Sequence, residues 1–183
     1  MELTDKELWT LTHGMGLGAV FLLAFGGGLA GIWSMRSKLM TEEGLAERTP
    51  RLLIGTTVMA VVSWLTVLVG TWIVYPWYRA TPPDGIDKAV QSEALRDFPR
   101  FWLLAGEQTA EWHKFGMEWK EHVAFLAPFL ATAVAFAVLY YGAQLVHRSD
   151  IRRAILVFFT LSFAAAGIAG LFGALITKAA PIV

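Results

Sequence analysis

The chain contains no cysteine and carries little charge. Only 16% of its 183 residues are charged, and 15 basic residues balance 15 acidic ones. Without cysteine there are no disulfides, iron–sulfur clusters, thiolate metal sites or covalently attached c-type haem. Without an excess of basic residues, nothing indicates nucleic acid as a partner. Haem b stays compatible with this composition, because histidine alone can hold its iron.

Familiar catalytic motifs are missing as well. The sequence has no nucleotide-binding Walker motif, no nucleophile elbow and no zinc-protease HExxH motif. The long apolar segments contain no aspartate or glutamate. Transporters usually carry polar groups or broken helices at the middle of the membrane, so this pattern disfavours a transporter.

What the chain does have is apolar residues in long runs. Hydrophobic residues make up 56% of the sequence, and its mean hydropathy is +0.52. A helix needs about 20 apolar residues to cross a hydrocarbon core of about 30 Å. Four segments are long enough, namely 9–33, 52–76, 123–146 and 155–176. The acidic amino end, MELTDKE, is unlike a secretion signal, so we expect the first segment to be a membrane span.

These segments predict an all-α integral membrane protein, a four-helix bundle forming a single transmembrane domain over residues 1–183. Thr4 and Glu7 have the spacing of a capping box for the first helix, and Thr49-Pro50 is typical of a helix start for the second. The expected helices cover about 5–35, 50–76, 107–147 and 150–177, with a loop and helix cap over 77–117 between the second and third.

Basic residues set the expected orientation. They gather in the first and third connections, as Arg36, Lys38, Arg48 and Arg51 and as Arg148, Arg152 and Arg153. The positive-inside rule then places both termini and the cap outside the cytoplasm, with the protein integral to the cell (inner or plasma) membrane.

Two histidines lie where apolar segments begin on this outer side. His13 stands above a stripe of small residues that starts at Gly16, and His122 directly precedes the third apolar run. Helical periodicity puts His122 on one face of the third helix with Glu118 and Phe129, and it puts His113 on the opposite face. A titratable residue at such a depth is a functional candidate.

We interpret this pattern first as a haem b or quinone site near the outer surface. His13 and His122 are the expected metal ligands for a haem, and Gly16 and Phe129 the expected lining. Glu118 and Glu121 are the expected bases for protons released by quinol. The chain would be a small subunit of a respiratory or photosynthetic electron-transfer complex rather than an enzyme alone. Its partners would be the lipid bilayer, other subunits and quinone.

Two alternatives stay open at this point. The chain can be a non-catalytic accessory subunit whose histidines only form hydrogen bonds. It can instead carry a metal at Glu118 and His122, with Glu111 above them, or a chlorophyll-type pigment on one histidine. A site shared by His13 and His122 requires the first and third helices to be neighbours, with the glycine stripe turned toward Phe129 and Phe136.

Overall fold

The computed structural model describes residues 2–180, and every regular element in that range is a helix. Four of the helices are long and apolar enough to span a membrane. They are Asp5–Ser34, Glu42–Tyr78, Ala110–Val146 and Ser149–Ala179. The expectation of an all-helical chain with four apolar spans is therefore confirmed.

The first span consists of three consecutive helical segments, α1 (Asp5–Leu11), a π-helical turn (Thr12–Gly16) and α2 (Leu17–Ser34). The predicted capping box is present at its start. The Glu7 amide donates to Thr4 Oγ1 at 3.3 Å, and the Thr4 amide donates to the Glu7 carboxylate at 2.8 Å. These bonds satisfy amides that have no partner within the helix.

The second span begins earlier than the sequence predicts. It comprises α3 (Glu42–Val69), a second π-helical turn (Gly70–Val74) and α4 (Tyr75–Tyr78). Thr41 caps α3 by accepting a hydrogen bond of 3.1 Å from the Gly44 amide, and Pro50 lies inside the helix. The prediction of a start near residue 50 was wrong because the first acidic turn, capped by Thr41, forms a helix before the apolar run begins.

The third span is interrupted between α6 (Ala110–Glu121) and α7 (Leu126–Tyr141), where Val123–Phe125 forms a 3₁₀ turn. Pro128 has no amide hydrogen, so it cannot bond the carbonyl four residues earlier. The interruption lies in the turn preceding Pro128, so the helix expected over about 107–147 is not continuous. A second 3₁₀ segment, Gly142–Val146, ends this span, and α8 (Ser149–Ala179) forms the fourth without interruption.

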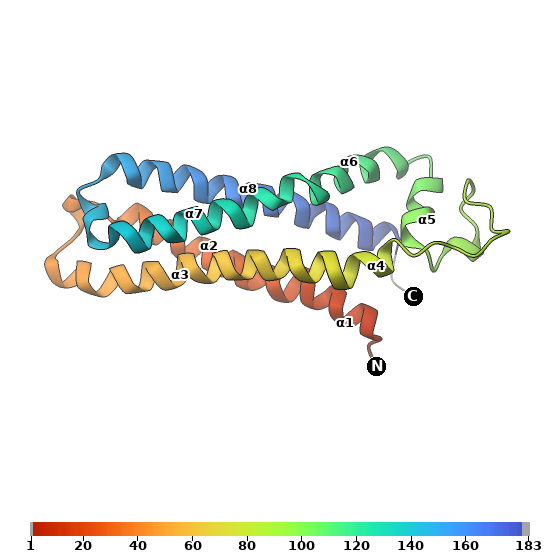
Figure 1. The fold of residues 1–183 in the computed structure, drawn as a ribbon, viewed down its shortest axis with the longest axis horizontal. Coiled ribbons are helices and arrows are strands. Elements are labelled where there is room, and N and C mark those ends of the chain that lie inside the picture. Colours follow the sequence, from red (N-terminus) through yellow and green to blue (C-terminus); the bar gives the residue numbers. More distant parts are fainter. Residues whose placement is uncertain (1, 181–183) are drawn as a thin grey trace.

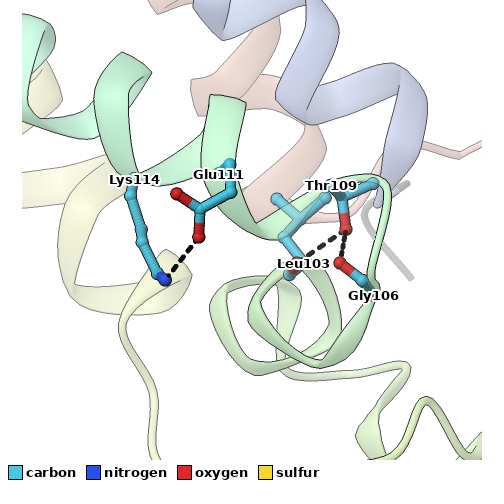
Figure 2. Close-up of polar contacts among 5 residues, drawn as sticks. All are labelled: Leu103, Gly106, Thr109, Glu111 and Lys114. Carbon is cyan, nitrogen blue, oxygen red and sulfur yellow. Dashed lines mark hydrogen bonds and ion pairs between the residues drawn. The ribbon is translucent and has the colours of Figure 1, made fainter.

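A segment of short elements connects the second and third spans. It contains a 3₁₀ turn (Glu93–Leu95) and α5 (Pro99–Ala105). Thr109 stabilises the turn that connects α5 to α6. Its hydroxyl donates to the carbonyls of Leu103, at 2.6 Å, and Gly106, at 3.1 Å (Figure 2). One helical turn later, Glu111 pairs with Lys114 at 2.8 Å (Figure 2). This turn sets the position of the first residues of α6, His113 included.

The four long helices lie side by side, with both described chain ends and α5 at one end of the molecule (Figure 1). We refer to this as the α5 end. Helix α2 packs against α3 and α8, and α7 packs against the same two helices. Consequently α2 and α7 lie diagonally across the molecule. The core contains Phe25 stacked on Phe163, with 4.0 Å between ring centroids, beside the fully buried Phe159.

Candidate functional site

His13 is turned toward the interior of the molecule by the first π-helical turn. Its ring lies against Gly70, which opens the π-helical turn of the second span. A Cβ atom at Gly70 would approach His13 Cε1 to 2.8 Å, so only glycine leaves room for the ring. Nδ1 of His13 is buried and has no hydrogen-bond partner. Buried polar atoms are almost always paired, so a free one in the interior marks a candidate binding site.

Lys120 extends into the same interior from α6. Its ammonium lies against α8, where a Cβ atom on Gly173 would come within 3.0 Å of Nζ. Lys120 lies within electrostatic reach of the His13 ring, and the backbone of Thr66 in α3 lies close enough to act on the same ring. Among residues 2–180, no carboxylate forms an ion pair with Lys120. One residue from each of the four spans therefore contributes to this region, which we call the His13–Lys120 site: His13, Gly70, Lys120 and Gly173.

The helices depart from α-helical geometry around this site. The two π-helical turns carry His13 and Gly70, and the 3₁₀ turn of the third span follows Lys120 by three residues. Helix α8 contacts both the first π-helical turn and the 3₁₀ turn. A π-helical turn inside an α-helix is rare and is frequently found at a functional site.

A second set of polar contacts lies between this site and the α5 end. The hydroxyl of Tyr75 donates to the carboxylate of Glu121, and the hydroxyl of Tyr78 is hydrogen-bonded to Nε2 of His113. The rings of Tyr75 and Tyr78 stack with centroids 6.2 Å apart, so the two contacts are adjacent. We call these four residues the tyrosine layer.

His113 is the buried histidine of the third span. It is only 3% exposed, and its Nδ1 has no hydrogen-bond partner, like that of His13. The Trp112 ring stands edge-on to it, and the charges of Arg100 and Glu121 act on it. The sequence predicted that His113 and His122 point in opposite directions, and His113 is the one that points inward.

His122 lies on the surface. Its side chain is 68% exposed, and Nδ1 is 3.2 Å from the Glu118 carboxylate, which is itself 75% exposed. Nδ1 also lies 3.1 Å from the carbonyl oxygen of Glu118. Phe129, on the same face, is 59% exposed and touches Trp64 edge to face, with ring centroids 5.1 Å apart. Gly16 is exposed, and a Cβ atom there would have no neighbour within 4 Å.

The structure does not bring His13 and His122 together. A shared site would require the first helix to lie beside the third, whereas α2 and α7 are diagonal. The face that carries Glu118, His122 and Phe129 is turned outward, and the inward face is formed by small residues, namely Ala127, Ala131, Val134 and Val138. Small side chains let helices approach closely, whereas bulky ones are accommodated on the outside.

This arrangement bears on the cofactors that the sequence suggested. A haem held by two imidazoles needs both rings on the same iron, and an inward His13 with an outward His122 does not fit that requirement. Within residues 2–180, no group of three or more histidine, cysteine, aspartate or glutamate side chains is placed to hold a metal ion. Glu118 and His122 form an exposed pair one helical turn apart.

Sequence reasoning missed Lys120, Tyr75 and Tyr78, and it gave His113 no role. One pattern in the sequence could have indicated the inward face of the third span. His113, Gly116 and Lys120 follow one another at intervals of three and four residues, which is the spacing of a helix face. Gly116 on that face lies against Phe172 of α8, where a Cβ atom would come within 2.6 Å of the ring. The glycine distinguishes this face as the packed one.

Comparisons of the chain with models of protein families, with curated proteins and with solved structures found no match. What the chain does is therefore inferred from its own residues.

Proposed function

We propose that the chain is a small subunit of a membrane electron-transfer complex and binds quinone at the His13–Lys120 site. In this proposal the four spans form a transmembrane bundle, and residues 79–109 cap it outside the cytoplasm. The observation that carries the proposal is the unpaired, buried Nδ1 of His13 in the same interior region as the ammonium of Lys120.

A quinone headgroup matches the chemistry of these two side chains. It is a flat, apolar ring with two carbonyl oxygens, and each oxygen accepts hydrogen bonds. The ammonium of Lys120 is a donor, and the imidazole of His13 is a donor at the ring nitrogen that carries its proton and an acceptor at the other. A charged donor strengthens such a bond, and the cation also stabilises the negative charge that a quinone gains on reduction. The apolar helices around the site suit a ligand that partitions into lipid.

Open glycines support the role as a subunit. A Cβ atom at Gly14 or Gly18 would have no neighbour within 4 Å, and the same holds at Gly167 and Gly170 of α8. Gly14 and Gly18 have the four-residue spacing that lets transmembrane helices approach closely. Since nothing in residues 2–180 packs on them, they leave places for helices of other subunits. The alternative is a non-catalytic accessory role, and the following experiment distinguishes that role from quinone binding.

The test is a binding measurement on the purified, detergent-solubilised protein. Decylubiquinone and a short-tailed naphthoquinone are titrated while tryptophan fluorescence is followed, and co-purified quinone is extracted and quantified. Losing a hydrogen bond from a buried donor costs about 1–3 kcal/mol, so we expect His13→Ala and Lys120→Met to weaken binding about 5- to 150-fold. His122→Ala is the matched control and should change the affinity less than about twofold, because its ring is exposed.

Thermal unfolding of each variant shows whether the substitution left the fold intact. Saturable binding that is lost in His13→Ala and kept in His122→Ala supports the quinone site. Absence of saturable binding in the unmodified protein, together with no extractable quinone, overturns it and favours the accessory role. Equal quinone affinity of His13→Ala and His122→Ala also overturns the assignment of the quinone site to His13.

A further inference from the structure

Within residues 2–180, the His13–Lys120 site contains a positive charge without a negative one. The ammonium of Lys120 lies against Gly173 of α8, and α8 also contacts the π-helical turn that carries His13. Lys120 is half-buried, and no carboxylate of the described residues forms an ion pair with it. A charge among apolar helices is costly unless it is paired, so this position favours a ligand that carries the opposite charge.

The carboxylates that lie nearest to Lys120 in the chain are engaged elsewhere. Glu118 is exposed, and its carboxylate is 3.2 Å from Nδ1 of His122. Glu121 accepts a hydrogen bond from the hydroxyl of Tyr75. In the described part of the chain, no carboxylate acts on either side chain of the site, so the charge of Lys120 is left for a ligand to neutralise.

We propose that this site holds quinone in its one-electron-reduced form, as an unprotonated semiquinone anion, and therefore favours anionic over neutral quinone ligands. The inference rests on the proposed quinone function and adds the charge and redox state of the ligand that binds best. The ammonium of Lys120 pairs with the negative oxygen, and His13 donates to the other oxygen through the ring nitrogen that carries its proton.

Reduction of the bound quinone then occurs in two unequal steps. In the first step, quinone takes one electron and no proton and becomes the semiquinone anion. In the second step, the anion takes one more electron and two protons from water, and both O–H bonds of the quinol form. The electrons come from a one-electron carrier of the complex, such as a haem protein, or from reduced mediator dyes in the test. Oxidation of quinol follows the same steps in reverse.

The ammonium of Lys120 makes the first step favourable because it binds the product of that step better than the reactant. A hydrogen bond between a cation and an anion is stronger than one between a cation and a neutral carbonyl. A binding site shifts an equilibrium only by its difference in affinity for the two forms, and here that difference favours the anion. An ammonium is also a weaker acid than a semiquinone, so the proton stays on Lys120 and the ion pair persists.

A pair of matched ligands tests the preference for an anion. The hydroxyl of 2-hydroxy-1,4-naphthoquinone is ionised at neutral pH, whereas 2-methoxy-1,4-naphthoquinone is neutral. Both are titrated into the detergent-solubilised protein while tryptophan fluorescence is followed, and we expect the anion to bind more tightly. Lys120→Gln keeps a donor but removes the charge, so the ratio of the two affinities should fall about 10- to 150-fold. Lys114→Gln is the matched control and should keep the ratio, because Lys114 is exposed on the same helix.

Electron paramagnetic resonance tests the redox form directly. The protein is reconstituted with decylubiquinone and poised at a series of potentials with mediator dyes. We expect a semiquinone radical in the unmodified protein and in Lys114→Gln, and a radical at least about tenfold weaker in Lys120→Gln. The potential of the first step should not change with pH, because that step takes up no proton.

The ligand pair and the pH dependence are measured on the unmodified protein, so the test does not depend on the folding of a variant. Equal affinity for the two naphthoquinones, or a first-step potential that falls as pH rises, overturns the inference. A preference for the anion that survives in Lys120→Gln also overturns it. In these cases the neutral quinone still binds, and the proposed function stands. If no quinone binds saturably to the unmodified protein, the proposed function fails, and this inference fails with it.

Discussion

Single polar residues inside the apolar spans follow two patterns. Thr56 and Ser63 of α3 donate to carbonyls of their own helix, at 2.9 and 2.8 Å. Ser162 of α8 instead donates across to the Ala127 carbonyl of α7, at 2.8 Å. Trp64 crosses to the third span in the same way, because its indole donates to Thr132 Oγ1 at 3.1 Å. An indole N–H inside an apolar span needs a hydrogen-bond partner, and the structure identifies Thr132 as the partner of Trp64.

We expect Ser162→Ala to lower the free energy of unfolding by about 0.6 kcal/mol, the average for a hydrogen bond between transmembrane helices. Ala127 follows the interrupted turn and directly precedes Pro128, so the bond also holds α8 against the third span at this point. Unfolding of the purified protein in mixed micelles, titrated with denaturing detergent, measures the effect. Ser63→Ala is the control, since its hydroxyl only bonds its own helix. An equal loss in both variants would contradict a special role for Ser162.

At the scale of helices, glycines set how closely the spans approach. A Cβ atom on Gly28 of α2 would come within 2.6 Å of Phe159 Cζ, and one on Gly31 would come within 3.0 Å of Leu52 Cδ1. Phe159 is fully buried and packs against Phe25, so its ring has little room to move. Of the glycines that the sequence placed on a packing stripe, Gly31 packs as expected, whereas Gly27 is open.

Gly28→Ala should therefore lower the stability of the protein, by about 1–3 kcal/mol for an overpacked core. Gly26→Ala places the same methyl group on the same helix, where it would meet nothing within 4 Å. This control should leave stability unchanged or raise it slightly through helix propensity. The midpoint of thermal unfolding in detergent compares the two variants. Equal midpoints would mean that α2 and α8 are less tightly packed than the structure shows.

For the whole molecule, the distribution of basic residues gives the orientation that the proposed function needs. The connections 35–41 and 147–148 lie at the end opposite to α5 (Figure 1). Seven of the 15 basic residues are in these connections or in the first turns of the helices that follow them, namely Arg36, Lys38, Arg48, Arg51, Arg148, Arg152 and Arg153. The positive-inside rule assigns that end to the cytoplasm. With this orientation, the His13–Lys120 site and the tyrosine layer are expected toward the outer surface.

The absence of cysteine makes this orientation easy to test. Ser37 and Ala89 are exposed residues near opposite ends of the molecule. We expect a membrane-impermeant maleimide to label Ala89→Cys in intact cells and to label Ser37→Cys only after permeabilisation. The unmodified chain, which has no thiol, gives the background. The reverse labelling pattern would place the His13–Lys120 site on the cytoplasmic side and would contradict the expected orientation.

The sequence by itself determined the number and place of the apolar spans, the cap at Thr4 and the interruption before Pro128. Each of these depends on residues close together in the chain, through hydropathy, local hydrogen bonds or a missing amide. It also singled out His13, which the structure places in the interior.

Only the tertiary structure decided which side of the third span points inward. Hydropathy marks a membrane span but not its packed face, because lipid tails are as apolar as a protein core. The sequence favoured the face with Glu118, His122 and Phe129, and close packing selected the face with His113, Gly116 and Lys120 instead. Lys120 and His13 are 107 positions apart in the chain, and only the packing of α6 against α8 turns that lysine into the region of His13.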